Sequence, residues 1–306
     1  MCFAAPFGLL QKENILKIAV FFQKLLSSVC VVDNEKNIGY NEADNFKNGV
    51  IAMTFKKDKL TVKIYDTRDE MGIGAAADIA ACIKDLLSKK EEINMIFAAA
   101  PSQNDMLHHL CAADGIEWER INAFHMDEYV GLDANAPQCF SNFLKEKIFD
   151  IKPFKSVNLI NPAAKDSAEE CRRYTELLKS HPVDIVCMGI GENGHIAFND
   201  PHVAEFDDAE TVKPVTLDEV CRNQQVNDGC FEKLDDVPKT ALTLTIPALV
   251  SATYNFCVVP ASTKAEAVKN TVEGPITEMC PASILRQKDN AIMYCDADSS
   301  ALLQQK

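Results

Sequence analysis

A glycine-rich segment from Gly189 to Asp200 concentrates residues that suit proton transfer. It contains one imidazole, His195, with the Asn193 amide two residues before it and the Asp200 carboxylate five residues after it. An imidazole titrates near neutral pH and can carry protons to and from a hydroxyl group of a substrate. Asn193 and Asp200 are the candidates that fix the tautomer and orientation of the ring. The segment therefore predicts an enzyme.

The spacing of Gly189, Gly191 and Gly194 leaves two other interpretations open. It satisfies the pattern of a dinucleotide-binding loop, which requires a helix that opens at the third glycine. Pro201 follows only seven residues later, and the residues before it are typical of a turn. The segment also lies late in the chain, whereas that loop normally follows the first strand of a domain. The second alternative is a plain glycine-rich loop in which His195 has no chemical role.

Two adjacent acids, Asp127 and Glu128, directly follow an apolar segment and are flanked by His125 and Tyr129. Because successive side chains point in different directions, one carboxylate can face a pocket while the other anchors the loop. We expect Asp127 to be the base in the pocket and Glu128 to be structural.

A third polar segment covers residues 101–104 and offers Ser102, Gln103 and Asn104 after an apolar strand signal. Ser102 or Asn104 could cap the helix that follows, whose free N–H groups attract an anion. These three residues are therefore candidates for phosphate binding, and an ordinary helix cap is the alternative.

A fourth polar segment, Ser262, Thr263 and Lys264, follows the strand signal that ends near Val259. Hydroxyl groups, free helix N–H groups and an ammonium group come together there, a combination that suits phosphate. We expect Lys264 to bind the phosphate, and a surface lysine in the first helical turn is the alternative.

The elements that must position these segments alternate from Lys59 onward. Strands are predicted at 60–65, 93–98, 121–124, 157–160, 183–188, 241–244, 254–259 and 291–294, and helices at 69–87, 104–112, 140–149, 167–179 and 263–271. The alternation predicts an α/β, Rossmann-like fold: a mostly parallel sheet with helices on both faces, as one domain at 59–300. The loops after parallel strands meet at one edge of such a sheet, which would gather the polar segments. Residues 1–58 are interpreted as an appended N-terminal segment, partly disordered.

The composition limits the classes of partner. The chain has 306 residues, of which 47% are hydrophobic and 25% charged, as in soluble globular proteins. Its net charge of −14 argues against a nucleic-acid or anionic-membrane partner but not against a small phosphorylated ligand. The segment Ile15–Val32 is too short and too charged to span a membrane. Twelve scattered cysteines without a Cys-x-x-Cys pair indicate reduced thiols in a cytoplasmic protein.

Four segments together resemble the glucosamine-6-phosphate deaminase/isomerase family in their order and spacing, namely 126–132, 189–199, 237–243 and 262–265. The wider superfamily includes the 6-phosphogluconolactonases, which share the glycine–histidine loop and the Ser-Thr-Lys turn. The Met-Asp-Glu-Tyr sequence and the Ile-Ala-Phe-Asn continuation favour the deaminase branch.

The resemblance implies a reaction without cofactor or metal that converts glucosamine 6-phosphate to fructose 6-phosphate and ammonia. His195 would assist opening of the sugar ring, and Asp127 would move a proton from C2 to C1. Lys264 would hold the phosphate, helped by backbone amides of the 101–104 loop. The resemblance also implies that a homo-oligomer is plausible.

The chain departs from the family pattern at several positions. Family members usually carry Asp in place of Asn193 and Glu in place of Asp200, and a glycine-rich phosphate loop in place of 99–104. Their later phosphate-binding arginine has no clear match, since the nearest candidate, Arg222, is off register. Two alternatives therefore stay open. One is a 6-phosphogluconolactonase-like hydrolase in which His195 activates water, and the other is a non-catalytic sugar-phosphate sensor, which Asn193 motivates.

Overall fold

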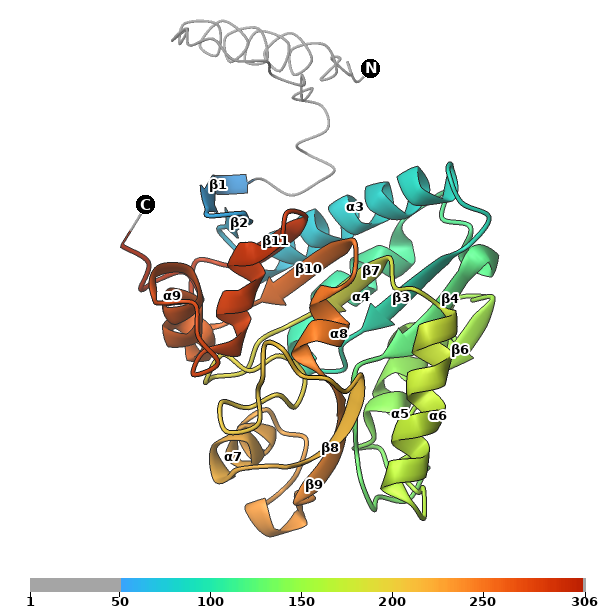
Figure 1. Cartoon of the computed structure of the whole chain (residues 1–306). Coiled ribbons are helices and arrows are strands. Elements are labelled where there is room, and N and C mark those ends of the chain that lie inside the picture. The colour runs from blue at the N-terminus through green and yellow to red at the C-terminus, as the bar shows by residue number, and fades with distance from the viewer. Residues whose placement is uncertain (1–50, 305–306) are drawn as a thin grey trace, which may run out of the picture. The chain divides into compact units, whose positions relative to one another are not determined.

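The computed structural model describes residues 51–304, and its centre is an eight-stranded sheet (Figure 1). The strand order is β1-β2-β11-β10-β7-β3-β4-β6, in which β1 and β2 pair antiparallel and the other neighbours pair parallel. The strands are β1 (Ile51–Lys57), β2 (Leu60–Tyr65), β3 (Ile93–Phe97), β4 (Ile121–His125), β6 (Ser156–Asn158), β7 (Ile185–Met188), β10 (Tyr254–Val259) and β11 (Ala291–Cys295). The predicted mostly parallel, Rossmann-like sheet is confirmed.

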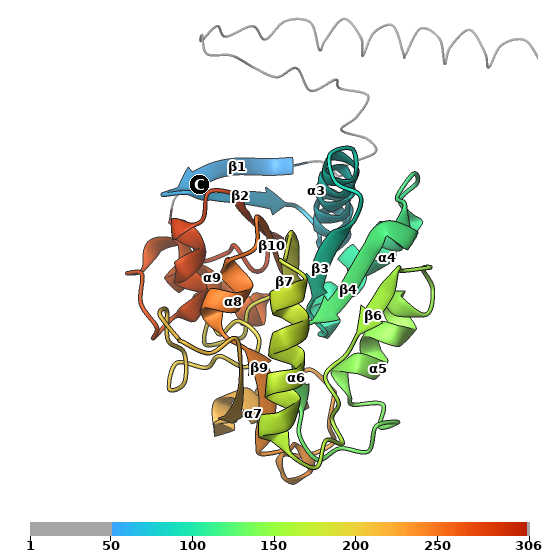
Figure 2. The same cartoon turned by 45° about the vertical axis from the view of Figure 1, so that its right-hand side comes forward.

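The sheet separates two hydrophobic cores, because successive side chains of a strand point to opposite faces. In β3, Met95 and Phe97 belong to one core and Ile96 to the other. The helices divide in the same way, as Figures 1 and 2 show. One core contains side chains of α3 (Arg68–Leu87), α4 (Asn104–Ala112) and α5 (Phe140–Leu144), and the other those of α6 (Ser167–Ser180), α8 (Ile246–Val250) and α9 (Ala265–Glu273). Helices on both faces were predicted and are confirmed.

A second, antiparallel sheet has the order β5-β9-β8 and is formed by β5 (Asp127–Tyr129), β9 (Thr240–Leu244) and β8 (Val212–Thr216). The strand predicted at 241–244 exists, but its assignment to the parallel sheet was wrong. The reason is that the chain leaves the main sheet after β4, and Asp127 then pairs with Thr243. The short helix α7 (Glu219–Asn227) lies between β8 and β9 in the chain.

Helix α3 begins where β2 ends, and its first turn is fixed by a capping box. Thr67 Oγ1 accepts a hydrogen bond from Glu70 N, and Glu70 Oε2 accepts one from Thr67 N at 3.1 Å. This cap places Arg68 at the first helical position, at the carboxyl end of a strand of the main sheet.

The helix predicted at 140–149 is α-helical only to Leu144 and continues as a π-helical turn, Lys145–Phe149. Residues 51–57, which the sequence analysis assigned to the appended segment, form the edge strand β1 of the main sheet. Residues 1–50, with the rest of that segment and Ile15–Val32, lie outside the described residues. Within 51–304, none of the helices combines the length and apolar character that crossing a membrane requires.

Candidate active site

A pocket lies at the carboxyl edge of the main sheet, and the four polar segments predicted from the sequence all contribute to its wall. They enter from the ends of four strands: 98–102 after β3, 126–127 after β4, 189–191 after β7 and 260–264 after β10. Parallel strands that end at one edge bring such loops together, as expected.

The glycines of the 189–194 loop make room for His195. A Cβ atom at Gly191 would overlap the His195 ring, and one at Gly194 would lie 2.7 Å from Cys280 Sγ. Gly194 also has a φ of +82°, which side-chain-bearing residues rarely adopt. No helix opens at Gly194, since the chain continues through turns to the bridge between Ile196 and Asn199. The dinucleotide interpretation therefore lacks the helix that it requires.

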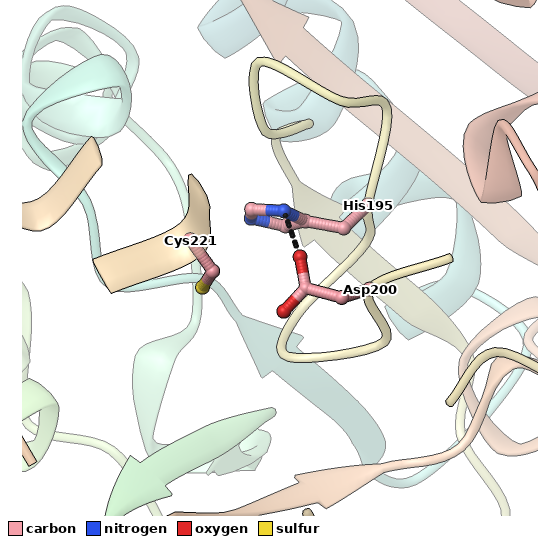
Figure 3. Close-up of side chains that lie close together, drawn as sticks. All are labelled: His195, Asp200 and Cys221. Carbon is pink, nitrogen blue, oxygen red and sulfur yellow. Dashed lines mark ion pairs between the residues drawn. The ribbon is translucent and has the colours of Figure 1, made fainter. Parts of the chain in front are cut away.

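Two side-chain oxygens contact the Nδ1 edge of the His195 ring. His195 Nδ1 lies 2.8 Å from Asn193 Oδ1 and 2.9 Å from Asp200 Oδ1, the second contact being the dashed line in Figure 3. Asn193 Oδ1 also accepts the backbone N–H of His195 at 3.0 Å, and Asn193 Nδ2 donates to Asp200 Oδ1 at 2.9 Å. Because Nδ1 faces only acceptors, it carries the proton, and Nε2 of the neutral ring is left as a proton acceptor.

Asp200 is fully buried and supplies the charge of this arrangement. Burial opposes its ionisation, but the hydrogen bonds and charge of His195, with the hydrogen bond from Asn193, hold the pKa of Asp200 below its usual range. A carboxylate that stays ionised can stabilise the imidazolium form of His195. Asp200, whose Oδ1 lies 2.9 Å from the ring, therefore supplies a carboxylate beside His195, whereas Asn193 supplies a neutral amide.

Asp127 and Glu128 are both buried but have different surroundings. Asp127 lines the pocket, and burial together with the charge of Glu128 raises its pKa well above the usual range. Glu128 accepts hydrogen bonds from the backbone N–H groups of Tyr129, Phe140 and Ser141 at 2.9–3.0 Å. It therefore satisfies the first N–H groups of α5, while Asp127 is directed to the pocket.

Lys264 is 5% exposed, and its ammonium group has no hydrogen-bond partner among residues 51–304. It belongs to the short 3₁₀ helix Ser262–Lys264 and lines the pocket together with Thr263. Burial lowers its pKa and outweighs the opposing charges of Asp228 and Glu192. A buried, unpaired ammonium group is costly, so this position favours a bound anion.

Of the three phosphate-binding candidates in the 101–104 segment, only Ser102 lines the pocket. Ser102 lines the pocket, whereas the side chain of Gln103 is buried behind it and donates to Ser102 Oγ at 3.0 Å and to Val258 O at 3.2 Å. Asn104 begins α4 and does not line the pocket. Neither Ser102 nor Asn104 makes a side-chain cap to this helix. In this geometry, Gln103 orients Ser102.

Arg68 lines the pocket and was missed by the sequence analysis. Its Nε donates to Asp105 Oδ2 and its Nη2 to Pro101 O, both at 2.6 Å, which fixes the guanidinium group beside the loop. The available signal was an arginine directly after the Thr67 cap, at the end of a strand. Arg222 instead donates to Leu234 O and Val237 O and does not line the pocket.

Helix α7 supplies a second group of residues that the sequence analysis missed, Gln224 and Gln225. Gln224 Oε1 accepts the backbone N–H of Glu192 at 3.0 Å, which joins α7 to the His195 loop. Both glutamine side chains are more than nine-tenths buried. The polar sequence of α7 gave no apolar periodicity from which to find them.

Comparison with known proteins gives consistent results. A sequence model of the glucosamine-6-phosphate isomerases/6-phosphogluconolactonase family matches residues 66–294. A glucosamine-6-phosphate deaminase of Listeria monocytogenes is 34% identical over 212 residues, which cover 69% of this chain and 88% of that protein. The solved structure of a monomeric glucosamine-6-phosphate deaminase is 29% identical, with a TM-score of 0.71 over 79% of this chain and 99% of its own.

A 6-phosphogluconolactonase from Thermotoga maritima shares the fold alone. It is 17% identical, with a TM-score of 0.64 over 78% of this chain and 100% of its own.

Proposed function

The chain belongs to the glucosamine-6-phosphate isomerase/6-phosphogluconolactonase family, and from this we propose that it is a glucosamine-6-phosphate deaminase. The enzyme converts glucosamine 6-phosphate and water to fructose 6-phosphate and ammonia. Aldose–ketose isomerisation moves a hydrogen from C2 to C1, and water then replaces the nitrogen at C2.

Ring opening is the step assigned to His195. With the Nδ1 proton held by Asn193 and Asp200, the free Nε2 can accept the proton of the C1 hydroxyl and return it to the ring oxygen. During this transfer the ring is an imidazolium, which the ionised Asp200 stabilises. Asp200 thus takes the electrostatic role, and Asn193 the positioning role.

Proton transfer from C2 to C1 is the step assigned to Asp127. A desolvated carboxylate with a raised pKa is a stronger base than an exposed one, as removal of a carbon-bound proton requires. Asp127 takes the C2 proton to give an enolamine and delivers a proton to C1. The resulting C2 iminium is hydrolysed by water, and ammonia leaves.

Binding of the substrate phosphate is assigned to Lys264 and Arg68, which line the same pocket. Lys264 supplies an ammonium group without a protein partner, and Arg68 supplies a guanidinium group held in place by Asp105 and Pro101. Ser102 and Thr263 supply hydroxyl groups in the same pocket. These donors replace the glycine-rich loop and the arginine that the chain lacks.

The observation that carries the proposal is the placement of Asp127 in the same pocket as an oriented His195. A lactonase needs an activated water but no base for a carbon-bound proton. A sensor needs neither a fixed tautomer nor a desolvated carboxylate. The pocket supplies both, which favours the isomerising deaminase.

The test is release of ammonia and fructose 6-phosphate from glucosamine 6-phosphate by the full chain, with His195→Ala as the control. We expect both products in equal amounts and none above background in the variant. Absence of turnover at high enzyme concentration would reject this substrate, and hydrolysis of 6-phosphogluconolactone or binding without turnover would then support the alternatives.

We also propose a cytoplasmic location, whereas the homo-oligomer that the resemblance made plausible stays an untested prediction. The ten cysteines within the described residues are free thiols, which supports a reducing compartment. Light scattering of the purified chain would test the assembly.

A further inference from the structure

We propose that His195, Asp200 and Cys221 bind one thiophilic divalent cation such as Zn²⁺, and that this ion inhibits the enzyme. Binding of the ion is independent of the reaction, whereas its inhibitory effect rests on the proposed function. The ion is an inhibitor here, and the expected reaction itself needs no metal.

The three side chains converge from two parts of the chain. His195 and Asp200 belong to the loop after β7, and Cys221 projects from α7 (Figure 3). One ligand atom from each lies within 4.8 Å of the other two, and all three residues are buried. Tetrahedral zinc, with bonds of about 2.0–2.3 Å, places its ligand atoms about 3.3–3.6 Å apart. Small side-chain rotations therefore suffice to close the site.

A second observation is that one oxygen of Asp200 is only weakly satisfied. Oδ1 is bonded to His195 and Asn193, whereas Oδ2 is buried, and the donor beside Asp200 on the other side is the Cys221 thiol, a weak donor. In Figure 3 this second oxygen points to the side on which the Cys221 sulfur lies. A cation held between Asp200 and Cys221 would take the place of the thiol proton and satisfy the carboxylate oxygen more strongly.

The ligand atoms of His195, Asp200 and Cys221 indicate which metal ion would bind. A thiolate, an imidazole nitrogen and a carboxylate oxygen suit Zn²⁺, whereas Mg²⁺ and Ca²⁺ prefer oxygen ligands alone. Two anionic ligands, Cys221 and Asp200, would neutralise the charge of the ion. Cys221 would lose its proton to solvent on binding, and a water molecule would complete four-fold coordination.

Inhibition follows whichever ring nitrogen of His195 takes the ion. An ion on Nε2 occupies the atom that accepts the proton of the sugar hydroxyl. An ion on Nδ1 forces the ring proton onto Nε2, which then cannot accept another, and also separates the ring from Asp200. Each arrangement removes the base that ring opening requires.

Direct binding is measured by titrating the metal-free full chain with Co²⁺ and recording its absorption spectrum. We expect visible bands typical of four-coordinate cobalt and a thiolate-to-cobalt charge-transfer band. Cys221→Ser should lose the charge-transfer band, and Cys221→Ala serves if the serine variant does not fold. Cys82→Ser, a thiol of α3 outside the cluster, should keep it. A band that persists without Cys221, or no cobalt binding at all, would overturn the proposal.

Inhibition is measured as ammonia release against Zn²⁺ concentration, with a chelator added to restore activity. The zinc concentration for half-inhibition should rise at least about tenfold in Cys221→Ser, as for loss of other metal-site contacts. Cys230→Ser removes a different thiol that lines the pocket and should leave that concentration unchanged. Zinc inhibition that depends on Cys230 and not on Cys221 would refute the inhibitory site. If the enzyme released no ammonia even without zinc, the proposed function would fail, and the cobalt spectra would still decide the site.

Discussion

The His195 loop and the Lys264 turn form different parts of one pocket and differ in how their polar groups are satisfied. Around His195 the protein supplies the partners: Asn193 and Asp200 hold Nδ1 from 2.8 and 2.9 Å. At the Lys264 turn the protein supplies none, because the Lys264 ammonium group is buried without a partner among the described residues.

This difference indicates that the His195 loop serves acid–base chemistry and that the Lys264 turn serves phosphate binding. Groups whose partners are provided by the protein are oriented before substrate arrives, as acid–base chemistry requires. A buried ammonium group left unpaired destabilises the free protein, and a bound phosphate removes that cost. We therefore expect changes at the His195 loop and Asp127 to reduce kcat, and changes at the Lys264 turn to raise KM.

The largest effect is expected for Asp127→Asn, which keeps the shape and removes the base. We expect kcat for ammonia release to fall by about 10²–10⁴-fold. Because the pKa of Asp127 is raised in the folded protein, its contribution to stability is lost as pH rises through that value. The variant should therefore have a higher Tm than the wild type at neutral pH. Asp114→Asn, the same change on an exposed turn, should alter neither quantity. A small loss of kcat would remove Asp127 from the mechanism.

Lys264→Met tests the other part of the pocket. Loss of charge-assisted hydrogen bonds to phosphate should raise KM by roughly 10–100-fold, with a smaller change in kcat. Removal of a buried, unpaired ammonium group should raise the Tm of the ligand-free protein. A lower Tm together with the wild-type KM would contradict the assignment of Lys264 as an unpaired group that binds phosphate.

Asn193→Asp tests whether the aspartate usual in the family would give a higher kcat than the asparagine of this chain. Asn193 Nδ2 donates to Asp200 Oδ1 at 2.9 Å, and an aspartate would place two carboxylate oxygens in that contact. Since like charges repel there, we expect kcat to fall about tenfold at neutral pH, measured as ammonia release. A rise in kcat would mean that the natural asparagine weakens the site.

Arg68→Lys tests whether the guanidinium group of Arg68 binds the substrate phosphate. Lysine keeps the charge but loses the planar group that Asp105 and Pro101 hold from two sides. KM should rise by about three- to tenfold, with kcat nearly unchanged, and inhibition by free inorganic phosphate should weaken in parallel. Unchanged inhibition by phosphate would place Arg68 outside the binding set.

Glu128→Gln tests the electrostatic coupling of the adjacent carboxyl groups. Burial and then the charge of Glu128 raise the pKa of Asp127. Without that charge the pKa falls, so the acid limb of the kcat/KM profile should move to lower pH, because the base stays ionised further into acid. In the wild type the two oxygens of Glu128 accept the N–H groups of Phe140 and Ser141. A glutamine side chain has only one oxygen acceptor for these groups, so the Tm should drop. An unmoved acid limb would assign that limb to another group.

The main sheet and the His195 loop were predictable because their signals are local. Strand β2 and helix α3 follow from period-two and helical apolar spacing. The glycines around His195 also have a local cause, since Gly191 leaves room for a ring four residues away.

The remaining parts depend on contacts between distant residues. Strand β5 has only three residues and exists because it pairs with β9, more than a hundred residues later. Arg68 resembles any exposed residue of a first helical turn until Asp105 and Pro101 orient it. Gln103 was predicted to touch phosphate, but its side chain turns inward to Val258. Such placements follow from tertiary packing, which apolar periodicity does not encode.

The most direct test of the account is steady-state ammonia release from glucosamine 6-phosphate by the wild type, His195→Ala and Lys264→Met, with kcat and KM determined separately. The account predicts that the histidine variant loses kcat by about 10²-fold or more, while the lysine variant mainly raises KM. Loss of kcat alone in the lysine variant, with a raised KM alone in the histidine variant, would contradict the division of the pocket into a proton-transfer part and a phosphate part.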